Sequence, residues 1–284
     1  MSHIQLRPTS HIFLRDAGSL QCGVDARHCG VIEHPRARVL VRLLLTARAP
    51  RLESDLIQDF IDHGFDPVFS NTIIAELKEF QVLAQVSGQT HRVALLGKSR
   101  VSKLLTSLFL EIGYRVHRPL SQETPQQFLA HLPAQVPIIL ENTIGQARKF
   151  HRHWATRGRT WIPVSTWDGQ GFIGPLHIRG SGPCPLCADL YFHHWDPHLP
   201  HLGAQAARMG FLDDPLSAAS TAARVLGLTR QLLEPPAFLS PRPATPHLQP
   251  EPGLFLHIDP FSPQLNHRML PVHHGCPSCF QRLS

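Results

Sequence analysis

The sequence predicts a chain in two parts, an α+β N-terminal domain of the winged helix-turn-helix type followed by an open α/β sheet domain. Three observations support this prediction. Short strand patterns and then three helical patterns fill the first part, strand and helix patterns alternate through the second, and two Cys-x-x-Cys pairs lie far apart within the second. We therefore expect one domain over residues 1–90 and a second over 91–284, closed by a four-cysteine zinc site.

The N-terminal domain begins with a small antiparallel ribbon over residues 11–33. "HIFLRD", "SLQCGV" and "HCGVIE" each have strand character, and Ala17-Gly18 is a turn between the first two. Ser70 or Asn71 is the expected N-cap of the last of three helices. The three helical patterns cover residues 36–48, 52–64 and 71–83.

The second domain opens with "RVALLGKSR", a buried-strand pattern, which is followed by a helix ending near Gly113 and by a second strand, "YRVHRPL". This order predicts a right-handed parallel βαβ unit. We expect a proline-rich loop over 235–253, and "LFLHID" and "NHRMLPVHH" as strands at one edge of the sheet. Further strands are expected over 136–142 and 160–167, and further helices over 144–158 and 215–234.

Composition narrows the function classes. The formal net charge of +6 and the pI of about 9.3 tolerate an acidic partner without requiring nucleic acid, since no run of five or more like charges is present. No apolar run reaches the roughly 18 residues of a membrane span, and the first residues lack the apolar core of a signal peptide. We expect a cytoplasmic protein with no membrane partner, in which paired cysteines act as metal ligands.

The cysteine pairs predict a structural zinc ion. Two thiolates separated by two residues can face one ion, and two such pairs complete the tetrahedral set that zinc prefers. Proline beside the first cysteine of each pair stiffens the turn. The predicted ligands are Cys184, Cys187, Cys276 and Cys279.

Other interpretations of the cysteines remain open. A neighbouring histidine could replace one thiolate, the candidates being His193, His194, His273 and His274. The pairs could also be unrelated buried or redox thiols, although we expect neither to stand between a strand and a helix as in thioredoxin. Cys22 and Cys29 are not spaced as a metal site and are interpreted as core or surface thiols.

The turn after the first strand of the second domain lacks a nucleotide motif. Only Gly97 is present, and Ser99 and Ser102 stand where a dinucleotide-binding turn has glycines. Lys98, Arg100 and Lys103 could attract phosphate, yet the side chains obstruct close approach of a pyrophosphate. We expect no cofactor site here, and no catalytic motif is found elsewhere.

Several stretches together resemble the leader-peptide-binding proteins of thiazole/oxazole-modified microcin pathways. These are relatives of the ThiF and ubiquitin-activating superfamily that assist YcaO cyclodehydratases. The stretches are "LRDAGSLQCGVDARHCGVIE", "RVALLGKSRVSKLL" and "GPCPLCADLYFHHWDPHLPHLGAQ" followed by the second Cys-x-x-Cys, and they span nearly the whole chain.

The resemblance implies that the N-terminal domain recognises the leader of a ribosomal precursor peptide. The leader would add as a strand beside the third ribbon strand and pack on the third helix. The residues that would contact it are Cys29, Gly30, Val31, Ile32, Glu33, Ile73, Ile74, Leu77 and Phe80. The second domain would have the ThiF-like fold, with the four cysteines as structural zinc ligands.

The implied partners are a precursor leader peptide, a YcaO-type cyclodehydratase that forms azolines, and a second copy of the chain, since this fold often pairs with itself. The chain would not be the catalyst. Two alternatives remain, a divergent ATP-dependent adenylating enzyme and a winged-helix DNA-binding regulator. Glu76 and Glu79 on the third helix, against one lysine, oppose a nucleic acid partner.

Overall fold

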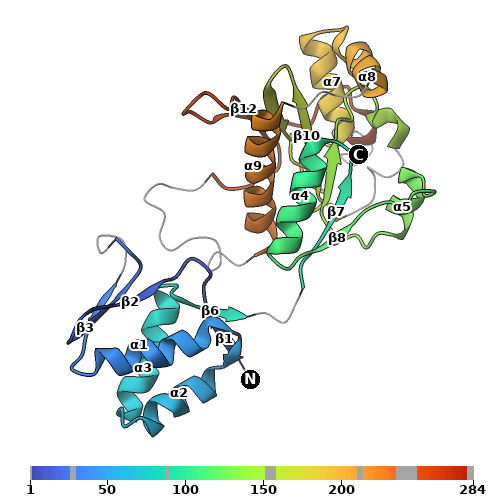
Figure 1. Cartoon of the computed structure of the whole chain (residues 1–284). Helices are drawn as coiled ribbons and strands as arrows, with labels where there is room; N and C mark the ends of the chain where they lie inside the picture. Colours follow the sequence, from blue (N-terminus) through green and yellow to red (C-terminus); the bar gives the residue numbers. More distant parts are fainter. Residues whose placement is uncertain are drawn as a thin grey trace. The chain divides into compact units, whose positions relative to one another are not determined.

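The computed structural model describes residues 2–25, 30–86, 90–150, 158–209, 214–234 and 248–279. The chain divides into two compact units (Figure 1). The first unit is Met1–Gln89 with Glu234–Leu248, and the second is Thr90–Leu233 with Gln249–Ser284. A mixed α/β architecture with one large sheet is therefore confirmed.

The antiparallel ribbon of the first unit lies where the sequence predicts it. Its strands are β2 (Ile12–Asp16), β3 (Ser19–Cys22) and β4 (Val31–Glu33), in the order β2-β3-β4. The Asp16 carboxylate closes the turn between β2 and β3, because it accepts hydrogen bonds from the Ser19 hydroxyl and the Gly18 amide. These bonds lower the pKa of Asp16.

Three helices pack on this ribbon, and the third begins earlier than the sequence predicts. Helix α3 starts at Pro67 because the Asp66 carboxylate accepts from the amides of Val68 (2.8 Å) and Phe69 (3.1 Å), and proline suits a first helical position. Ser70, an expected cap, is buried within the helix. The helices are α1 (Ala37–Leu45), α2 (Glu53–Asp62) and α3 (Pro67–Glu79).

A second small sheet in this unit escaped prediction. Strand β1 (His3–Leu6) pairs with β6 (Leu83–Val86) and with β5 (Arg51–Leu52), all antiparallel. The expected continuation of the third helix to residue 83 is wrong, since Gln81 has a φ of 60° and the chain turns there into β6.

A seven-stranded sheet forms the second unit, in the order β13-β12-β11-β10-β9-β7-β8. Strands β8, β7, β9 and β10 are parallel, and the remaining pairs are antiparallel. The predicted βαβ unit is observed as β7, helix α4 and β8, and the two strands expected at one edge are β12 and β13. The bounds are β7 (Arg92–Leu96), β8 (Arg115–His117), β9 (Ile138–Glu141), β10 (Trp161–Trp167), β11 (Gln170–Ile173), β12 (Leu254–Ile258) and β13 (Asn266–Met269).

Helices cover both faces of this sheet. Helices α4 and α9 lie side by side on one face (Figure 1). Gly171 permits this packing, since a Cβ there would lie 1.9 Å from the Thr221 hydroxyl of α9. Helix α7 packs on the other face through Phe192. The helices are α4 (Arg100–Glu111), α5 (Pro125–His131), α7 (Pro185–Trp195), α8 (Leu199–Met209) and α9 (Pro215–Leu233), with 3-10 turns at Thr46–Arg48 and Ala147–Phe150.

The helix expected over 144–158 is largely wrong within the described residues, where only the 3-10 turn at Ala147–Phe150 forms. The buried Asp189 carboxylate of α7 accepts hydrogen bonds from the amides of Gly145 and Ala147, so these amides do not form backbone hydrogen bonds of a helix. Burial raises the pKa of Asp189 to about 6. Residues 151–157, and 235–247 of the expected proline-rich loop, lie outside the described residues.

Among the described helices, none combines the length and hydropathy that crossing a bilayer requires.

Removing the Asp66 cap should weaken α3. In Asp66→Ala two amides at the start of the helix lose their acceptor, at a cost of about 1 kcal/mol. Hydrogen–deuterium exchange over α3 should then be about fivefold faster. Glu76→Ala, on the exposed middle of the same helix, is the control and should not speed exchange. Equal exchange in Asp66→Ala and the unaltered protein would contradict this role.

Candidate functional site

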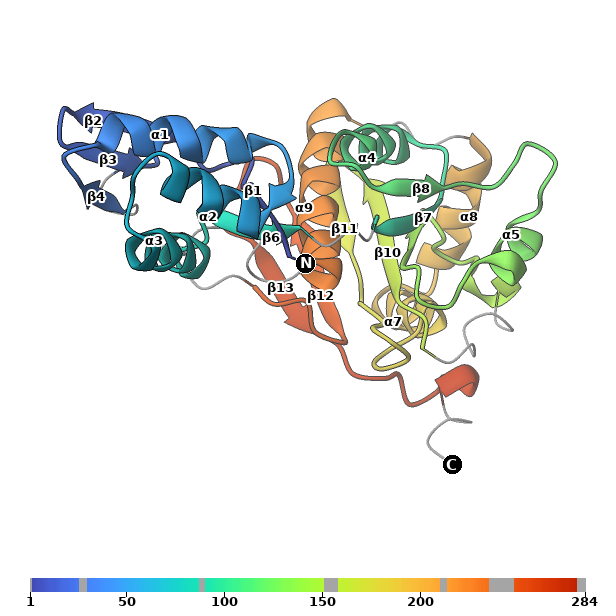
Figure 2. The same ribbon diagram turned by 90° about the horizontal axis from the view of Figure 1, so that it is seen from below.

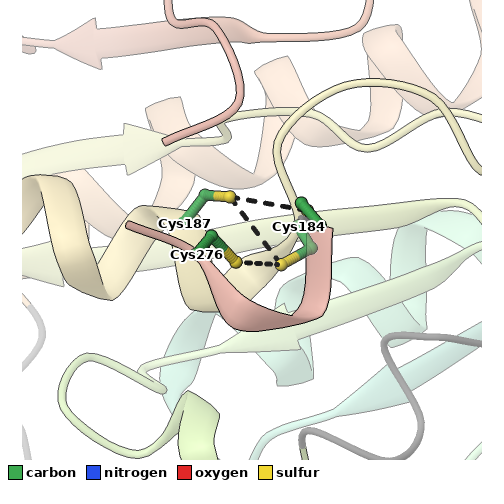
Figure 3. A group of neighbouring side chains, drawn as sticks. Cys184, Cys187 and Cys276 are labelled. Atoms are coloured by element: carbon green, nitrogen blue, oxygen red, sulfur yellow. Dashed lines mark hydrogen bonds between the residues drawn. The ribbon is translucent and has the colours of Figure 1, made fainter. Parts of the chain in front are cut away.

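Four cysteines from two distant segments form one buried cluster. The sulfur atoms of Cys184, Cys187, Cys276 and Cys279 all lie within 4.8 Å of one another, and all four residues are buried. Figure 3 shows the Cys184, Cys187 and Cys276 sulfurs directed toward a common point. The predicted pairing in space of the two Cys-x-x-Cys motifs is therefore observed.

The distances between the sulfurs fit a tetrahedral metal site. Sγ of Cys184 lies 3.9 Å from that of Cys187 and 3.6 Å from that of Cys276, and Cys187 lies 3.7 Å from Cys279. Four sulfurs held about 2.3 Å from one zinc ion would be about 3.8 Å apart. A disulfide needs about 2 Å, and these cysteines are free thiols. The four residues could therefore bind a metal ion.

The thiols of the cluster differ in pKa. Hydrogen bonds from the Cys184 and Cys187 thiols lower the pKa of Cys276 to about 7. Sharing its proton with Cys187 raises the pKa of Cys184. Hydrogen bonds from Cys184 and Cys187 also lower the pKa of Cys279, so the second pair loses its protons more readily than the first. Four buried negative charges together need a cation. A divalent metal would displace the remaining protons.

The start of helix α7 orients the side chains of the first cysteine pair. Cys184 is the N-cap of α7 and Pro185 takes its first position, so both cysteines lie at the N-terminus of the helix. This pair stands at the start of a helix, although the strand before it, β11, ends at Ile173. Both of its sulfurs nevertheless face the second pair, whose turn is closed by bonds from Cys276 N to His273 O and from Cys279 N to Cys276 O.

The other sulfur and imidazole candidates lie outside this cluster. His193, His194, His273 and His274 are not among the clustered ligands. Cys22 is buried in the core of the first unit, and Cys29 lies outside the described residues.

The N-terminus of α4, where a nucleotide-binding sheet holds phosphate, is filled by a carboxylate of this chain. Glu141, the last residue of β9, is buried and accepts from the amides of Ser99 (3.1 Å) and Ser102 (3.2 Å). The Ser102 hydroxyl donates at 2.8 Å, and the Ser99 hydroxyl donates as well. An anion supplied by the protein thus satisfies the helix terminus.

Gly97 is required by this carboxylate and not by a ligand. A Cβ on Gly97 would lie 2.0 Å from Oε2 of Glu141 and 2.6 Å from Oγ of Ser102. The residues at this turn therefore do not fit a nucleotide phosphate, which would meet a like charge in a filled space. Sequence reasoning identified the missing glycines and missed Glu141. The feature of the sequence that could have identified Glu141 is an acidic residue at the end of the apolar strand pattern "VPIILE".

The outer edge of β4 is a candidate peptide-binding edge. Cys22 N donates to Gly30 O and His34 N to Gly18 O, so the ladder to β3 engages Gly30, Ile32 and His34. The N–H and C=O groups of Val31 and Glu33 therefore point away from β3. Val31 and Glu33 are exposed, and Ile32 packs on the core.

The α3 residues predicted to contact a peptide fall into two groups. Ile73, Ile74 and Leu77 are buried in the core of the first unit, where they hold the helix on the ribbon. Phe80 is 49% exposed at the end of α3. Sequence reasoning missed Phe69, whose ring lies 5.1 Å from that of His34 just after β4. The assumed later start of the helix concealed it.

The fold resembles that of solved microcin and heterocyclase biosynthesis proteins. The heterocyclase TruD superposes with a TM-score of 0.59 at 12% identity, covering 98% of this chain and 43% of that one. Escherichia coli MccB with MccA has a TM-score of 0.51 at 9% identity, covering 98% and 99%. MccB with ATP has a TM-score of 0.50 at 10% identity, with the same coverage. The resemblance inferred from the sequence is confirmed at the level of fold.

The chain spans less than half of the heterocyclase chain that it matches. No family model and no curated protein sequence matched this chain.

Cys276→Ser should abolish metal binding at the cluster. The hydroxyl is a poor substitute for a thiolate, and three thiolates leave an open position. Metal content of the purified protein, measured by mass spectrometry, should fall from about one zinc per chain to near zero. Cys22→Ala, which removes a buried thiol of the first unit, should retain the metal. Equal zinc in Cys276→Ser and the unaltered protein would rule out the site.

Glu141→Ala should destabilise the second unit. The amides of Ser99 and Ser102 lose their acceptor, at a cost of about 2 kcal/mol. Urea unfolding followed by the near-ultraviolet signal should shift to lower denaturant concentration. Glu111→Ala, at the exposed end of the same helix, is the matched control and should leave the midpoint unchanged.

Proposed function

We propose that this protein binds the leader peptide of a ribosomally synthesised precursor and presents it to a YcaO-type cyclodehydratase, which forms thiazoline or oxazoline rings in the core peptide. The first unit is the recognition domain, a winged-helix recognition element over residues 1–90. The second unit is a non-catalytic relative of the adenylating fold.

The observation that carries this proposal is the edge of β4. An extended leader can pair with the outward N–H and C=O groups of Val31 and Glu33, and this pairing needs no rearrangement of the ribbon. The partly buried ring of Phe69 on α3 lies 5.1 Å from the ring of His34, just after β4, and is an apolar contact close to such a strand. The core residues Ile73, Ile74 and Leu77 would support α3 from beneath.

The filled terminus of α4 supports a presenting role over an adenylating one. Glu141 supplies the negative charge that ATP phosphates would bring, and binding of ATP there would require its displacement from four hydrogen-bond donors. The adenylating alternative therefore predicts ATP binding that this turn opposes.

A structural zinc ion held by Cys184, Cys187, Cys276 and Cys279 fits the same role. Four buried thiolates leave no open coordination position for a substrate. The ion would join the segment after β13 to the start of α7, and it would stabilise the second unit without taking part in chemistry.

The comparisons support the choice of partners. MccB has been crystallised with MccA, and its fold covers this chain almost completely. TruD is a heterocyclase, and more than half of its chain has no counterpart in the present sequence. We propose that a YcaO-type enzyme performs the ring-forming chemistry. A second copy of this chain is retained as a further proposed partner.

Leader binding should depend on the outward amide of Val31. In Val31→Pro the edge loses one donor that would pair with the leader, while the ladder to β3 keeps all of its bonds. A synthetic leader, from the precursor encoded beside this gene, should bind at least tenfold more weakly in fluorescence anisotropy. Val31→Ala shortens the side chain but keeps the amide, and it should bind within about twofold of the unaltered protein.

Two outcomes would oppose the proposed function. Equal binding of the leader by Val31→Pro and Val31→Ala would exclude pairing at this edge. Exchange of radiolabelled pyrophosphate into ATP by the purified protein would support an adenylating enzyme instead.

A further inference from the structure

An aromatic pocket lies at the antiparallel end of the large sheet, and none of the four cysteines lines it. Its volume is 510 Å³, within the range of ligand-binding sites. Phe172 of β11 and Phe255 of β12 provide apolar surface, and Trp195, the last residue of α7, is another lining residue. The Trp195 and Phe255 rings lie 5.8 Å apart, and the Phe172 ring stacks on His257 at 4.9 Å.

The exposure of Trp195 needs an explanation. Its side chain is 45% exposed beside this aromatic surface. A large apolar ring left in contact with water next to other apolar rings is unfavourable, and such patches commonly mark a surface that a partner covers. Tryptophan is also frequent among the residues that dominate binding energy.

The polar part of the pocket is basic. Arg268 contributes a fixed positive charge, and the His257 ring stacks on Phe172 at the same pocket. The described residues that line the pocket include no carboxylate. The pocket therefore favours a ligand that brings both an aromatic group and a carboxylate, since a guanidinium binds carboxylate through charge-assisted hydrogen bonds.

The pocket adjoins a free strand edge. Strand β13 lies next to β12 as the last strand of the sheet (Figure 2). All four of its residues are exposed. Phe255 pairs with Arg268 and His257 with Asn266. The side chains of Arg268 and Asn266 therefore lie on the same face of the sheet as the pocket. Leu270 N donates to Gly253 O, so Leu270 and every second residue before it bond to β12. The N–H and C=O groups of His267 and Met269, which lie between them, therefore point away from the sheet.

We propose that β13 and this pocket together bind an extended acidic segment of a partner protein, in which an aromatic residue and a carboxylate residue lie two positions apart. The segment adds as an eighth strand next to β13. Alternate side chains then face the pocket, the aromatic one beside Trp195 and Phe255 and the acidic one on Arg268. A free small molecule would use the pocket but would have no need of the edge.

This site lies in the second unit, and the proposed leader edge lies in the first. A negative result at one of these sites therefore does not contradict the proposal for the other. The two edges of the large sheet also provide an internal comparison. Strand β8 at the opposite edge carries the exposed Arg115, which is not among the residues lining the pocket.

The experiment measures binding of fluorescein-labelled peptide SFTETFS to the full chain by anisotropy, with SFTKTFS as the charge-reversed probe. We expect the acidic peptide to bind at least tenfold more tightly, and its affinity to fall as salt is raised. Arg268→Glu should weaken it at least tenfold, whereas the matched control Arg115→Glu should stay within about twofold. Trp195→Ala should also weaken binding, without loss of zinc from the protein.

A third probe separates strand addition from occupation of the pocket alone. SFTETFS that is N-methylated at alternate residues keeps its side chains and loses the N–H groups that pair with β13. Binding equal to that of the unmodified peptide would overturn strand addition. Equal binding by Arg268→Glu and Arg115→Glu would overturn the site. A concentration-dependent dimer that Arg268→Glu abolishes, with no peptide binding, would assign the edge to a second copy.

Discussion

Four thiols that share one small buried volume are the constraint on which the second unit depends. Cys184 and Cys187 begin α7, whereas Cys276 and Cys279 follow the edge strand β13. Their sulfurs cannot all carry charge without a cation, so the proton arrangement and metal binding are linked. Because α7 also carries Asp189, which holds the loop after β9, the same helix links the cluster to the end of the sheet where Glu141 lies.

The carboxylate of Glu141 satisfies the N-terminus of α4 from within the chain. A helix N-terminus presents unpaired amides that demand an acceptor, and here a residue of the neighbouring strand provides it. Glycine is needed at position 97 because the Glu141 carboxylate occupies the space that a Cβ would fill. The architecture of this turn thus serves the stability of the second unit.

The two surfaces that we propose bind partners are strand edges. Each unit has an edge strand whose alternate backbone groups point outward, β4 in the first and β13 in the second. Free edges are hazardous because they pair indiscriminately, and proteins usually protect them. Here each edge stands beside side chains that could select a partner, an aromatic ring of α3 in one case and a basic aromatic pocket in the other. Two such edges are consistent with a protein that assembles a peptide and an enzyme.

The sequence by itself determined the local elements, since strand alternation, helical periodicity and the spacing of each cysteine pair are properties of neighbouring residues. The ribbon, the βαβ unit and the pairs Cys184/Cys187 and Cys276/Cys279 were predictable for this reason. Only the tertiary structure decided what distant segments bring to one another. Strand β1 depends on β6, the loop expected as a helix yields to Asp189, and Glu141 meets the α4 terminus only because β9 lies beside β7. Such contacts depend on strand order, which no local pattern encodes.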